Sequence, residues 1–247
     1  MRHFGIIGHP LLHSFSAKYF NDMFQKEQID AEYSLYPIDE NDFERVKDLL
    51  DRLDGMNITL PYKQTIIPYL KGLDETASAI GAVNVVHNHI GYNTDCLGFM
   101  ESIHPLLRPY DKKALVLGTG GASKAICYGL TKLQIEPTLV SRTPNERAIG
   151  YDAIDQSIMD NHSIIINCTP LGMLPDVESC PNIPYELISN RHLLFDCIYN
   201  PEETLFLKKG RLQGASTQNG MRMLIGQANA AWKIWNKDIS FADYQTE

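Results

Sequence analysis

The sequence lacks three features that would mark a membrane protein, a disulfide-stapled protein or a nucleic-acid-binding protein. No apolar run approaches the roughly 18 residues of a membrane-spanning helix, and residues 1–8 lack the apolar core of a signal peptide. The five cysteines stand far apart, without a CxxC pair or a His/Cys cluster at zinc spacing. The 22 Lys and Arg against 30 Asp and Glu disfavour nucleic acid and anionic membranes as partners. We therefore expect a cytoplasmic protein with reduced thiols and no metal site.

What the sequence contains is an alternation of apolar strands and amphipathic helices. In the first half we expect strands at residues 4–8, 31–37 and 55–60, helices at 16–25 and 42–53, and a hairpin at 87–89. A second series begins at Lys113, with strands at 114–117, 137–140, 164–166 and 193–198 and helices at 122–133 and 221–235. This alternation predicts an α/β layer structure, and the chain divides naturally near Gly98.

A glycine-rich loop lies between the strand at 114–117 and the helix that follows. Its residues are Gly118, Thr119, Gly120, Gly121, Ala122 and Ser123. Glycines let the backbone turn sharply and approach a ligand, and the N–H groups and positive end of a helix attract phosphate. The loop departs from GxGxxG because Ser123 occupies the last small position. Its place between a strand and a helix nevertheless favours dinucleotide binding.

The end of the next strand indicates which dinucleotide is bound. An NAD site has an acidic residue roughly 20 residues beyond the loop, where it binds the ribose 2′-OH. Here Ser141, Arg142 and Thr143 stand at that point, and Arg147 follows. Hydroxyls and cations suit a 2′-phosphate, so the sequence favours NADP. The alternative is that Arg142 is an ordinary solvated arginine.

Polar residues gather at the strand ends of the first half, where ligands of α/β folds bind. Each has an ordinary structural explanation as a helix cap, a turn residue or a surface charge. Together they offer hydroxyls, amides, one ammonium and one carboxylate, which suits a small, polyhydroxylated acid as the ligand. They are Ser14, Ser16, Asn57, Thr59, Lys63, Asn84, Asn93, Thr94 and Asp95.

These motifs, taken in order, resemble the shikimate dehydrogenase family. The resemblance extends from residue 4 to about residue 236. It is carried by residues 8–16 (GHPLLHSFS), 55–63 (GMNITLPYK), 81–84 (GAVN), 93–95 (NTD), 118–122 (GTGGA), 141–143 (SRT), 167–173 (NCTPLGM), 199–201 (YNP) with Thr204, and 220–227 (GMRMLIGQ).

The resemblance implies an α/β fold of two domains with a cleft between them. Residues 1–98 would form the substrate-binding and catalytic domain and residues 99–219 a Rossmann-like NADP domain. Residues 220–247 would form a C-terminal helix that returns to the first domain. Only 20 residues, Pro144 to Ser163, separate SRT from the strand at Ile164, about half of what the family normally has there. We therefore expect a truncated Rossmann half.

The resemblance also implies the chemistry: NADPH-dependent, reversible reduction of 3-dehydroshikimate to shikimate, an oxidoreductase step of chorismate and aromatic amino acid biosynthesis. By position, Lys63 and Asp95 match the catalytic pair, with Lys63 giving a proton to the developing oxyanion and Asp95 orienting it. The substrate contacts match Ser14, Ser16, Thr59, Asn84, Tyr199 and Gln227. The cofactor contacts match Gly118, Thr119, Gly120, Gly121, Ala122, Ser141, Arg142, Thr143, Arg147, Cys197 and Gly220.

A second departure and three alternatives accompany the resemblance. Ser141 stands where the family usually has Asn, which removes an amide near the adenosine end. The alternatives are a quinate/shikimate dehydrogenase using NAD, a non-catalytic NADP-binding paralogue, and a methylene-tetrahydrofolate dehydrogenase-like enzyme. Arg142 argues against the enzyme that uses NAD. The retained pair Lys63 and Asp95 argues against a non-catalytic paralogue, and the two serines argue against the methylene-tetrahydrofolate dehydrogenase-like enzyme. A monomer and a homodimer both remain open.

Overall fold

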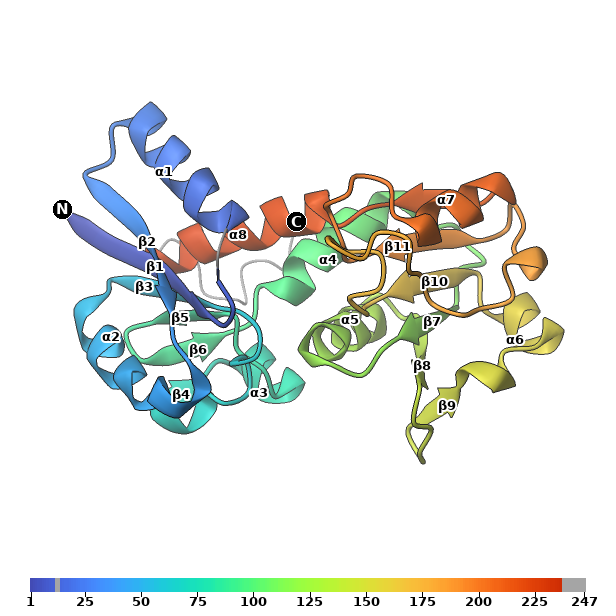
Figure 1. The fold of residues 1–247 in the computed structure, drawn as a ribbon, viewed down its shortest axis with the longest axis horizontal. Helices are drawn as coiled ribbons and strands as arrows, with labels where there is room; N and C mark the ends of the chain where they lie inside the picture. The colour runs from blue at the N-terminus through green and yellow to red at the C-terminus, as the bar shows by residue number, and fades with distance from the viewer. Residues whose placement is uncertain (12–13, 237–247) are drawn as a thin grey trace. The chain divides into compact units, whose positions relative to one another are not determined.

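The computed structural model describes residues 1–11 and 14–236 of the chain. The chain forms two compact units, one of Met1–Thr94 with the chain from Ala228 onward, the other of Asp95–Gln227. Each unit is built on a six-stranded sheet with helices on both faces, as the ribbon drawing shows (Figure 1). The predicted α/β fold class is confirmed. None of the helices in the described ranges combines the length and apolar character needed to cross a membrane.

The sheet of the first unit is mixed, in the order β2-β1-β3-β5-β6-β4. Its strands are β1 (Arg2–Gly8), β2 (Ala31–Pro37), β3 (Gly55–Ile58), β4 (Gly72–Leu73), β5 (Val85–His87) and β6 (Ile90–Tyr92). β2, β1 and β3 are parallel, and β5 runs antiparallel to both β3 and β6. Asn88 and His89 turn the predicted hairpin with positive φ angles of 50° and 62°, as tight hairpin turns require.

Successive side chains of a strand point to opposite faces, and both faces of this sheet are apolar. Phe4 and Ile6 pack with α1 (Phe15–Glu27) and with the end of α8 (Met221–Trp235). There Trp235 stacks on Phe4, with the ring centroids 4.9 Å apart. Ile7 faces the other layer, which contains α2 (Val46–Arg52) and α3 (Glu75–Ile80). Burying one such side chain stabilises the fold by about 1.5–3 kcal/mol, so the alternation fixes the register.

The second unit has an all-parallel sheet in the order β12-β11-β10-β7-β8-β9. Its strands are β7 (Lys113–Leu117), β8 (Glu136–Ser141), β9 (Ala148–Gly150), β10 (Ile164–Asn167), β11 (Leu193–Asp196) and β12 (Ser216–Gln218). One face is covered by α4 (Asp95–Ile103) and α5 (Gly121–Lys132), the other by α6 (Gln156–Asn161) and α7 (Leu205–Leu212). Strands buried on both faces are continuous apolar runs, which is why β7, β10 and β11 were predictable.

The connection after β8 is short, as the sequence predicts. Residues 142–147 turn directly from β8 into β9, and a bridge between Asn145 and Ala148 closes the turn. Residues 151–163 then hold one turn of 3-10 helix and the six-residue helix α6. This half of the sheet is a truncated Rossmann half.

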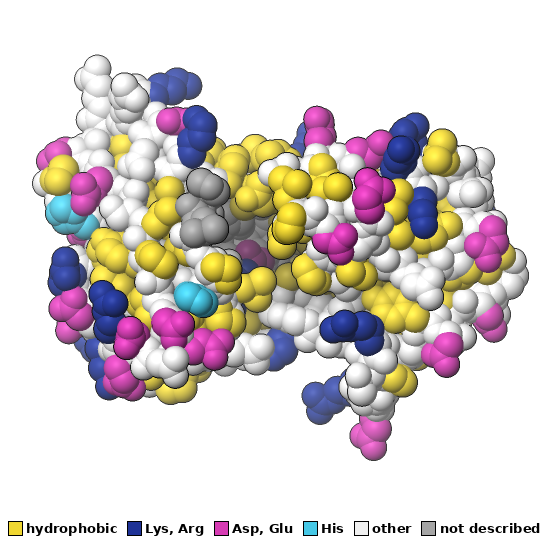
Figure 2. Space-filling view, in the orientation of Figure 1, with side chains coloured by type: hydrophobic (Ala, Val, Ile, Leu, Met, Phe, Trp, Pro, Cys, Tyr) yellow, Lys and Arg dark blue, Asp and Glu magenta, His cyan; other side chains and the backbone are white. Residues whose placement is uncertain are grey.

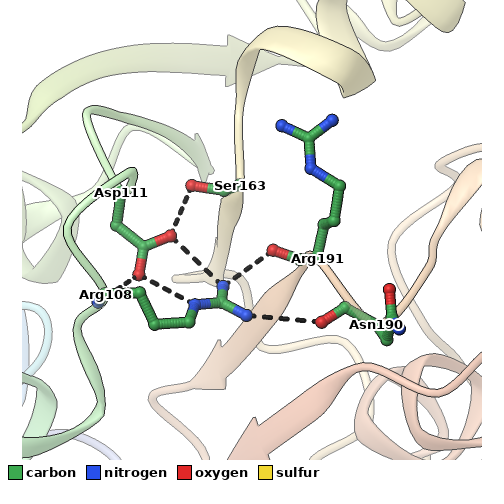
Figure 3. Close-up of polar contacts among 5 residues, drawn as sticks. All are labelled: Arg108, Asp111, Ser163, Asn190 and Arg191. Carbon is green, nitrogen blue, oxygen red and sulfur yellow. Dashed lines mark hydrogen bonds and ion pairs between the residues drawn. The ribbon is translucent and has the colours of Figure 1, made fainter.

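An ion pair ties together the starts of three strands at the amino end of this sheet (Figure 3). The Arg108 guanidinium contacts the Asp111 carboxylate at 3.1 Å before β7, and it also donates to the backbone carbonyls of Asn190 and Arg191 before β11. Ser163, the residue before β10, donates a 2.6 Å hydrogen bond to Asp111. The Asp111 side chain is fully buried, so these partners replace the water that it loses on folding.

One predicted helix differs from the observed structure. The single helix expected at residues 42–53 is a 3-10 helix at Glu40–Arg45 followed by α2 at Val46–Arg52. The Asp39 side chain accepts hydrogen bonds from the backbone and side chain of Asn41. These bonds cap the start of the 3-10 helix, and short 3-10 turns of this kind are frequent at the N-termini of α-helices.

Candidate active site

The first unit places five of the predicted site residues around the ends of its strands. Ser14 is the residue before α1, and its side chain makes no capping hydrogen bond to that helix. Ser16 is buried in the first turn of α1. Thr59 and Lys63 follow β3, and Asn84 precedes β5. The explanation that Ser14 serves as a helix cap is therefore not supported.

A buried chain of hydrogen bonds begins at Tyr33, beside Ser16. The Ser16 side chain lies beside the phenol of Tyr33, and the Tyr33 hydroxyl donates to Asn57 Oδ1 at 2.6 Å. Asn57 Nδ2 donates to the backbone carbonyl of Asn84 at 3.2 Å. Asn84 Oδ1 accepts from the N–H of Thr94 at 2.7 Å. Burial raises the pKa of Tyr33 well above its usual range, so this phenol stays protonated.

Backbone contacts fix the loop that carries Lys63. The carbonyl of Lys63 accepts a hydrogen bond of 2.7 Å from the N–H of Val83. The preceding residue, Tyr62, is 1% exposed and donates its hydroxyl to the carbonyl of Ile38. Thr59 is held by its N–H, which donates to the carbonyl of Ile7 at 2.9 Å. The ammonium of Lys63 is therefore carried by an anchored backbone, which limits the positions it can take.

Asp95 and Gln227 belong to the second unit. Asp95 is the first residue of α4 and is 7% exposed, and Gln227 lies in α8 with the same exposure. Phe99 of α4 and Met223 of α8 meet in one apolar cluster of this unit. Thr94, which precedes Asp95, is fixed by its bond to Asn84. The carboxylate of Asp95 and the amide of Gln227 are thus carried by two helices whose apolar side chains pack in one cluster.

The strand order of the second sheet reverses between β7 and β10, and ligands of such sheets bind at the carboxyl ends of these strands. The predicted glycine loop occupies this point. Gly118 has φ of +105°, which only glycine adopts readily. A Cβ on Gly120 would meet no atom within 4 Å, so open space faces the start of α5. The loop has the shape and the helix end that a pyrophosphate needs.

The segment after β10 packs against this loop, and two further segments of the same unit follow it in turn. Gly118 packs against Cys168 and Thr169, the residues after β10. The Cys168 and Cys197 sulfurs lie 3.8 Å apart across the ends of β10 and β11. A Cβ on Gly220 would lie 2.3 Å from the carbonyl oxygen of Cys197, so glycine is required there. The structure thus brings the predicted residues Gly118, Cys197 and Gly220 to one edge of the sheet.

The predicted 2′-phosphate residues lie at the far end of that edge. Ser141 ends β8, and its hydroxyl accepts from the N–H of Thr143 at 3.2 Å. Arg142 and Arg147 are exposed on the turn into β9, and Figure 2 shows Lys or Arg side chains over this turn. Because the turn is exposed, both guanidinium groups have room to approach an anion.

Two buried polar residues of the sites received no role from the sequence. Tyr33 had the pattern of a core residue, because it alternates with polar residues along β2. Asp196 ends β11 with 0% exposure, and burial raises the pKa of its carboxyl to about 6. A carboxylate directly after a run of apolar residues was a usable signal for Asp196. Tyr33 had no comparable signal.

A pocket of about 230 Å³ lies in the second unit, near the amino end of its sheet. Among its lining residues, Ser163 bonds to Asp111, and both ring nitrogens of His192 have hydrogen-bond partners. Its buried polar groups are thus already satisfied, and it lies away from the glycine loop. Within the described part of the chain, no three His, Cys, Asp or Glu side chains are grouped to hold a metal ion.

Comparisons with known proteins agree on one family. Residues 6–86 match the model of the shikimate dehydrogenase substrate binding domain. A protein named shikimate dehydrogenase (NADP(+)) from Methanosphaera stadtmanae is 37% identical to this chain. The match covers 98% of this chain and 94% of the relative. Two crystal structures are also similar. Shikimate 5-dehydrogenase from Thermus thermophilus in complex with NADP(H) and shikimate has a TM-score of 0.86 at 28% identity, covering 96% of this chain and 94% of its own. Shikimate 5-dehydrogenase from Listeria monocytogenes in complex with shikimate and NAD has a TM-score of 0.83 at 25% identity, covering 99% and 94%.

Proposed function

This chain belongs to the shikimate dehydrogenase family, and from that premise we propose that it reduces 3-dehydroshikimate reversibly to shikimate with NADPH. The reaction is an oxidoreductase step on a CH–OH group, in the pathway to chorismate and the aromatic amino acids. The observation that carries the proposal is that the chain is 37% identical, over 98% of its length, to a relative named shikimate dehydrogenase (NADP(+)). The glycine loop at the reversal point of a parallel sheet supports it independently.

The second unit holds the groups that suit NADP. The glycine loop of Gly118, Thr119, Gly120, Gly121 and Ala122 would hold the pyrophosphate through backbone N–H groups at the start of α5. Ser141, Arg142, Thr143 and Arg147 would surround the 2′-phosphate with hydroxyls and cations. Cys197 and Gly220 would border the other end of the dinucleotide, beyond β10. When bound, the reduced dinucleotide supplies a hydride to the ketone carbon.

The first unit supplies most of the proposed contacts to the hydroxy acid. Ser14 and Ser16 would bind the carboxylate, and Thr59 and Asn84 the ring hydroxyls. Tyr199 and Gln227 would complete the substrate contacts from the second unit. An amide group held by a hydrogen bond, such as that of Asn84, is pre-organised to recognise a polyhydroxylated ligand.

Lys63 and Asp95 are the proposed catalytic pair. Reduction leaves negative charge on the former ketone oxygen, which needs a proton. The Lys63 ammonium would donate that proton, and the anchored loop limits the positions from which it does so. Asp95 would orient the ammonium and accept a hydrogen bond from a substrate hydroxyl. In the oxidising direction Lys63 would take the proton back.

NAD is the second candidate cofactor, because the similar Listeria monocytogenes structure contains shikimate with NAD. The exposed cations at the end of β8 favour NADP instead. We also propose that the protein works in the cytoplasm, on the basis of the biosynthetic reaction, as a monomer or a homodimer. Light scattering behind a sizing column tells these two forms apart.

A spectrophotometric assay tests the function. Shikimate and quinate are each offered with NADP and with NAD, and absorbance is followed at the reduced-nicotinamide band. Shikimate with NADP is expected to give the highest kcat/KM. No turnover of shikimate with either dinucleotide would overturn the proposal, and preference for quinate or NAD would replace it with the corresponding alternative.

A further inference from the structure

Asp196 is a buried carboxylate to which the proposed catalytic steps assign no role. It ends β11 in the second unit and is 0% exposed. Its Oδ2 accepts a 2.6 Å hydrogen bond from the Thr204 hydroxyl. Its Oδ1 accepts from the N–H of Ile198 at 3.0 Å and from Asn167 Nδ2 at 3.1 Å. These donors, all directed at one carboxylate, compensate for its removal from water.

Each donor belongs to a different segment at the carboxyl end of the sheet. Asn167 ends β10, and its Oδ1 accepts from both the N–H and the hydroxyl of Thr169, whose methyl group packs against Gly118. Ile198 stands between Cys197 and Tyr199 and accepts from the N–H of Gly220. One carboxylate thus joins the loop after β10 to the segment after β11.

The third donor, Thr204, anchors a helix. It is the residue before α7, and its oxygen also accepts from the N–H of Leu207 at 3.4 Å. The start of α7 is thereby linked to the same carboxylate. The connection from β11 into α7 is therefore held at both ends.

The direction of the dinucleotide follows from the sheet. With the 2′-phosphate at Arg142 beyond β8 and the pyrophosphate at the glycine loop after β7, the nicotinamide end extends toward β10 and β11. These are the segments that Asp196 connects. We propose that Asp196 is the positioning residue for the nicotinamide end of the dinucleotide, holding the loops after β10 and β11 in the arrangement that receives it. The inference rests on the proposed function of this unit.

The ionisation of Asp196 provides a readout that packing alone would not give. Burial raises the pKa of its carboxyl to about 6. Its titratable neighbours are Cys168, Cys197 and Tyr185, and burial raises the pKa of Cys168 and of Tyr185 well above their usual ranges. Protonation removes negative charge and acceptor capacity from the centre of the network. Dinucleotide binding is therefore expected to weaken as the pH falls through about 6.

The test compares two buried carboxylates at opposite ends of the same sheet. Asp196→Asn changes the carboxyl end, and Asp111→Asn changes the amino end, where Asp111 bonds to Ser163 and Arg108. The Kd for NADP is measured by calorimetry, and KM and kcat with shikimate by absorbance. Asp196→Asn is expected to raise the Kd and KM for NADP about tenfold, and Asp111→Asn to leave both within twofold.

A second pair of variants keeps the test decisive if Asp196→Asn does not fold. Thr204→Val removes the hydroxyl that donates to Asp196, whereas Thr204→Ser keeps it. The valine variant is expected to raise the Kd for NADP several-fold, and the serine variant to match the wild type. Between pH 5 and 7 the wild-type Kd should change more than that of Asp196→Asn, which also separates Asp196 from titration of the ligand's own phosphate.

Several results would overturn the inference. These are an unchanged Kd in Asp196→Asn, an equal rise in Asp111→Asn, or identical behaviour of the two Thr204 variants. Such a result beside normal wild-type turnover leaves the proposed function standing. An inactive wild type that still binds NADP overturns the proposed function and leaves the calorimetric test of Asp196 valid.

Discussion

The hydroxyl of Tyr33 donates a 2.6 Å hydrogen bond to the side-chain oxygen of Asn57, and both residues are buried. Asn57 Nδ2 donates to the carbonyl of Asn84, which fixes the amide oxygen as the acceptor for Tyr33. The Tyr33 oxygen, whose proton is used in this bond, remains an acceptor on the side of Ser16. The direction of the hydrogen bonds is thus set from the backbone carbonyl of Asn84 to the hydroxyl of Tyr33.

Replacing Tyr33 by Phe is expected to destabilise the protein by about 1–3 kcal/mol, because the Asn57 oxygen loses its donor inside the core. Urea unfolding measures the difference. Tyr69→Phe is the control, since it removes a phenol that bonds to exposed Glu44 in the same unit. The control is expected to change stability by less than about 0.5 kcal/mol. Equal losses in the two variants would contradict the role given to burial.

Breaking the ion pair at the amino end of the second sheet is expected to lower the free energy of unfolding by a larger amount. Asp111→Ala leaves the Ser163 hydroxyl without this acceptor and the Arg108 guanidinium with backbone carbonyls but no counter-charge, and we expect about 3 kcal/mol of destabilisation. Glu136→Ala removes the partner of Lys113 in a solvent-exposed pair and should cost less than about 1 kcal/mol. Thermal and urea unfolding check both values. A loss below about 1 kcal/mol for Asp111→Ala would show that the network does not hold the strand starts together.

Asp196 predicts a pH dependence of stability. Its folded pKa of about 6 exceeds the value near 3.9 of an unfolded Asp, so the folded state holds its proton longer. Its contribution is therefore greatest below about pH 4 and falls by roughly 3 kcal/mol as the pH rises to about 6. Asp196→Asn should lack this fall. Urea unfolding at several pH values measures the difference, and parallel curves for the two proteins would contradict it.

We expect Arg142 to determine the preference for NADP over NAD. Arg142→Ser is expected to raise the KM for NADP by about tenfold or more and to leave the KM for NAD unchanged, because only NADP carries the 2′-phosphate. Arg191→Ser replaces another exposed arginine of the same unit and serves as the control. If both KM values rise together in Arg142→Ser, the arginine does not read the 2′-phosphate.

Long apolar patterns made most of the fold predictable. The run at 114–117 predicts β7, because a strand covered on both faces is apolar throughout. The spacing in residues 221–235 predicts α8 with its observed ends. The short elements β9 and β12, with three residues each, carry too little pattern to be recognised. Their pairing depends on neighbouring strands that a local pattern does not contain.

The candidate site was predictable where residues act through backbone position and much less where they act through distant partners. The glycine loop shows itself locally, because strand, glycines and helix are consecutive. Tyr33 and Asn57 are 24 positions apart, and Asn167 and Asp196 are 29 apart. The sheet pairings bring each of these pairs together, and no local pattern in the sequence specifies those pairings.

The kinetics of Lys63→Ala test the central claim most directly. Wild type, Lys63→Ala and the surface control Lys18→Ala are assayed with shikimate and NADP at the reduced-nicotinamide band. Loss of the proton donor is expected to lower kcat by on the order of 10² or more while the KM for NADP stays within twofold. Lys18→Ala should match the wild type. An unchanged kcat in Lys63→Ala would remove Lys63 from the chemistry and contradict the proposed mechanism.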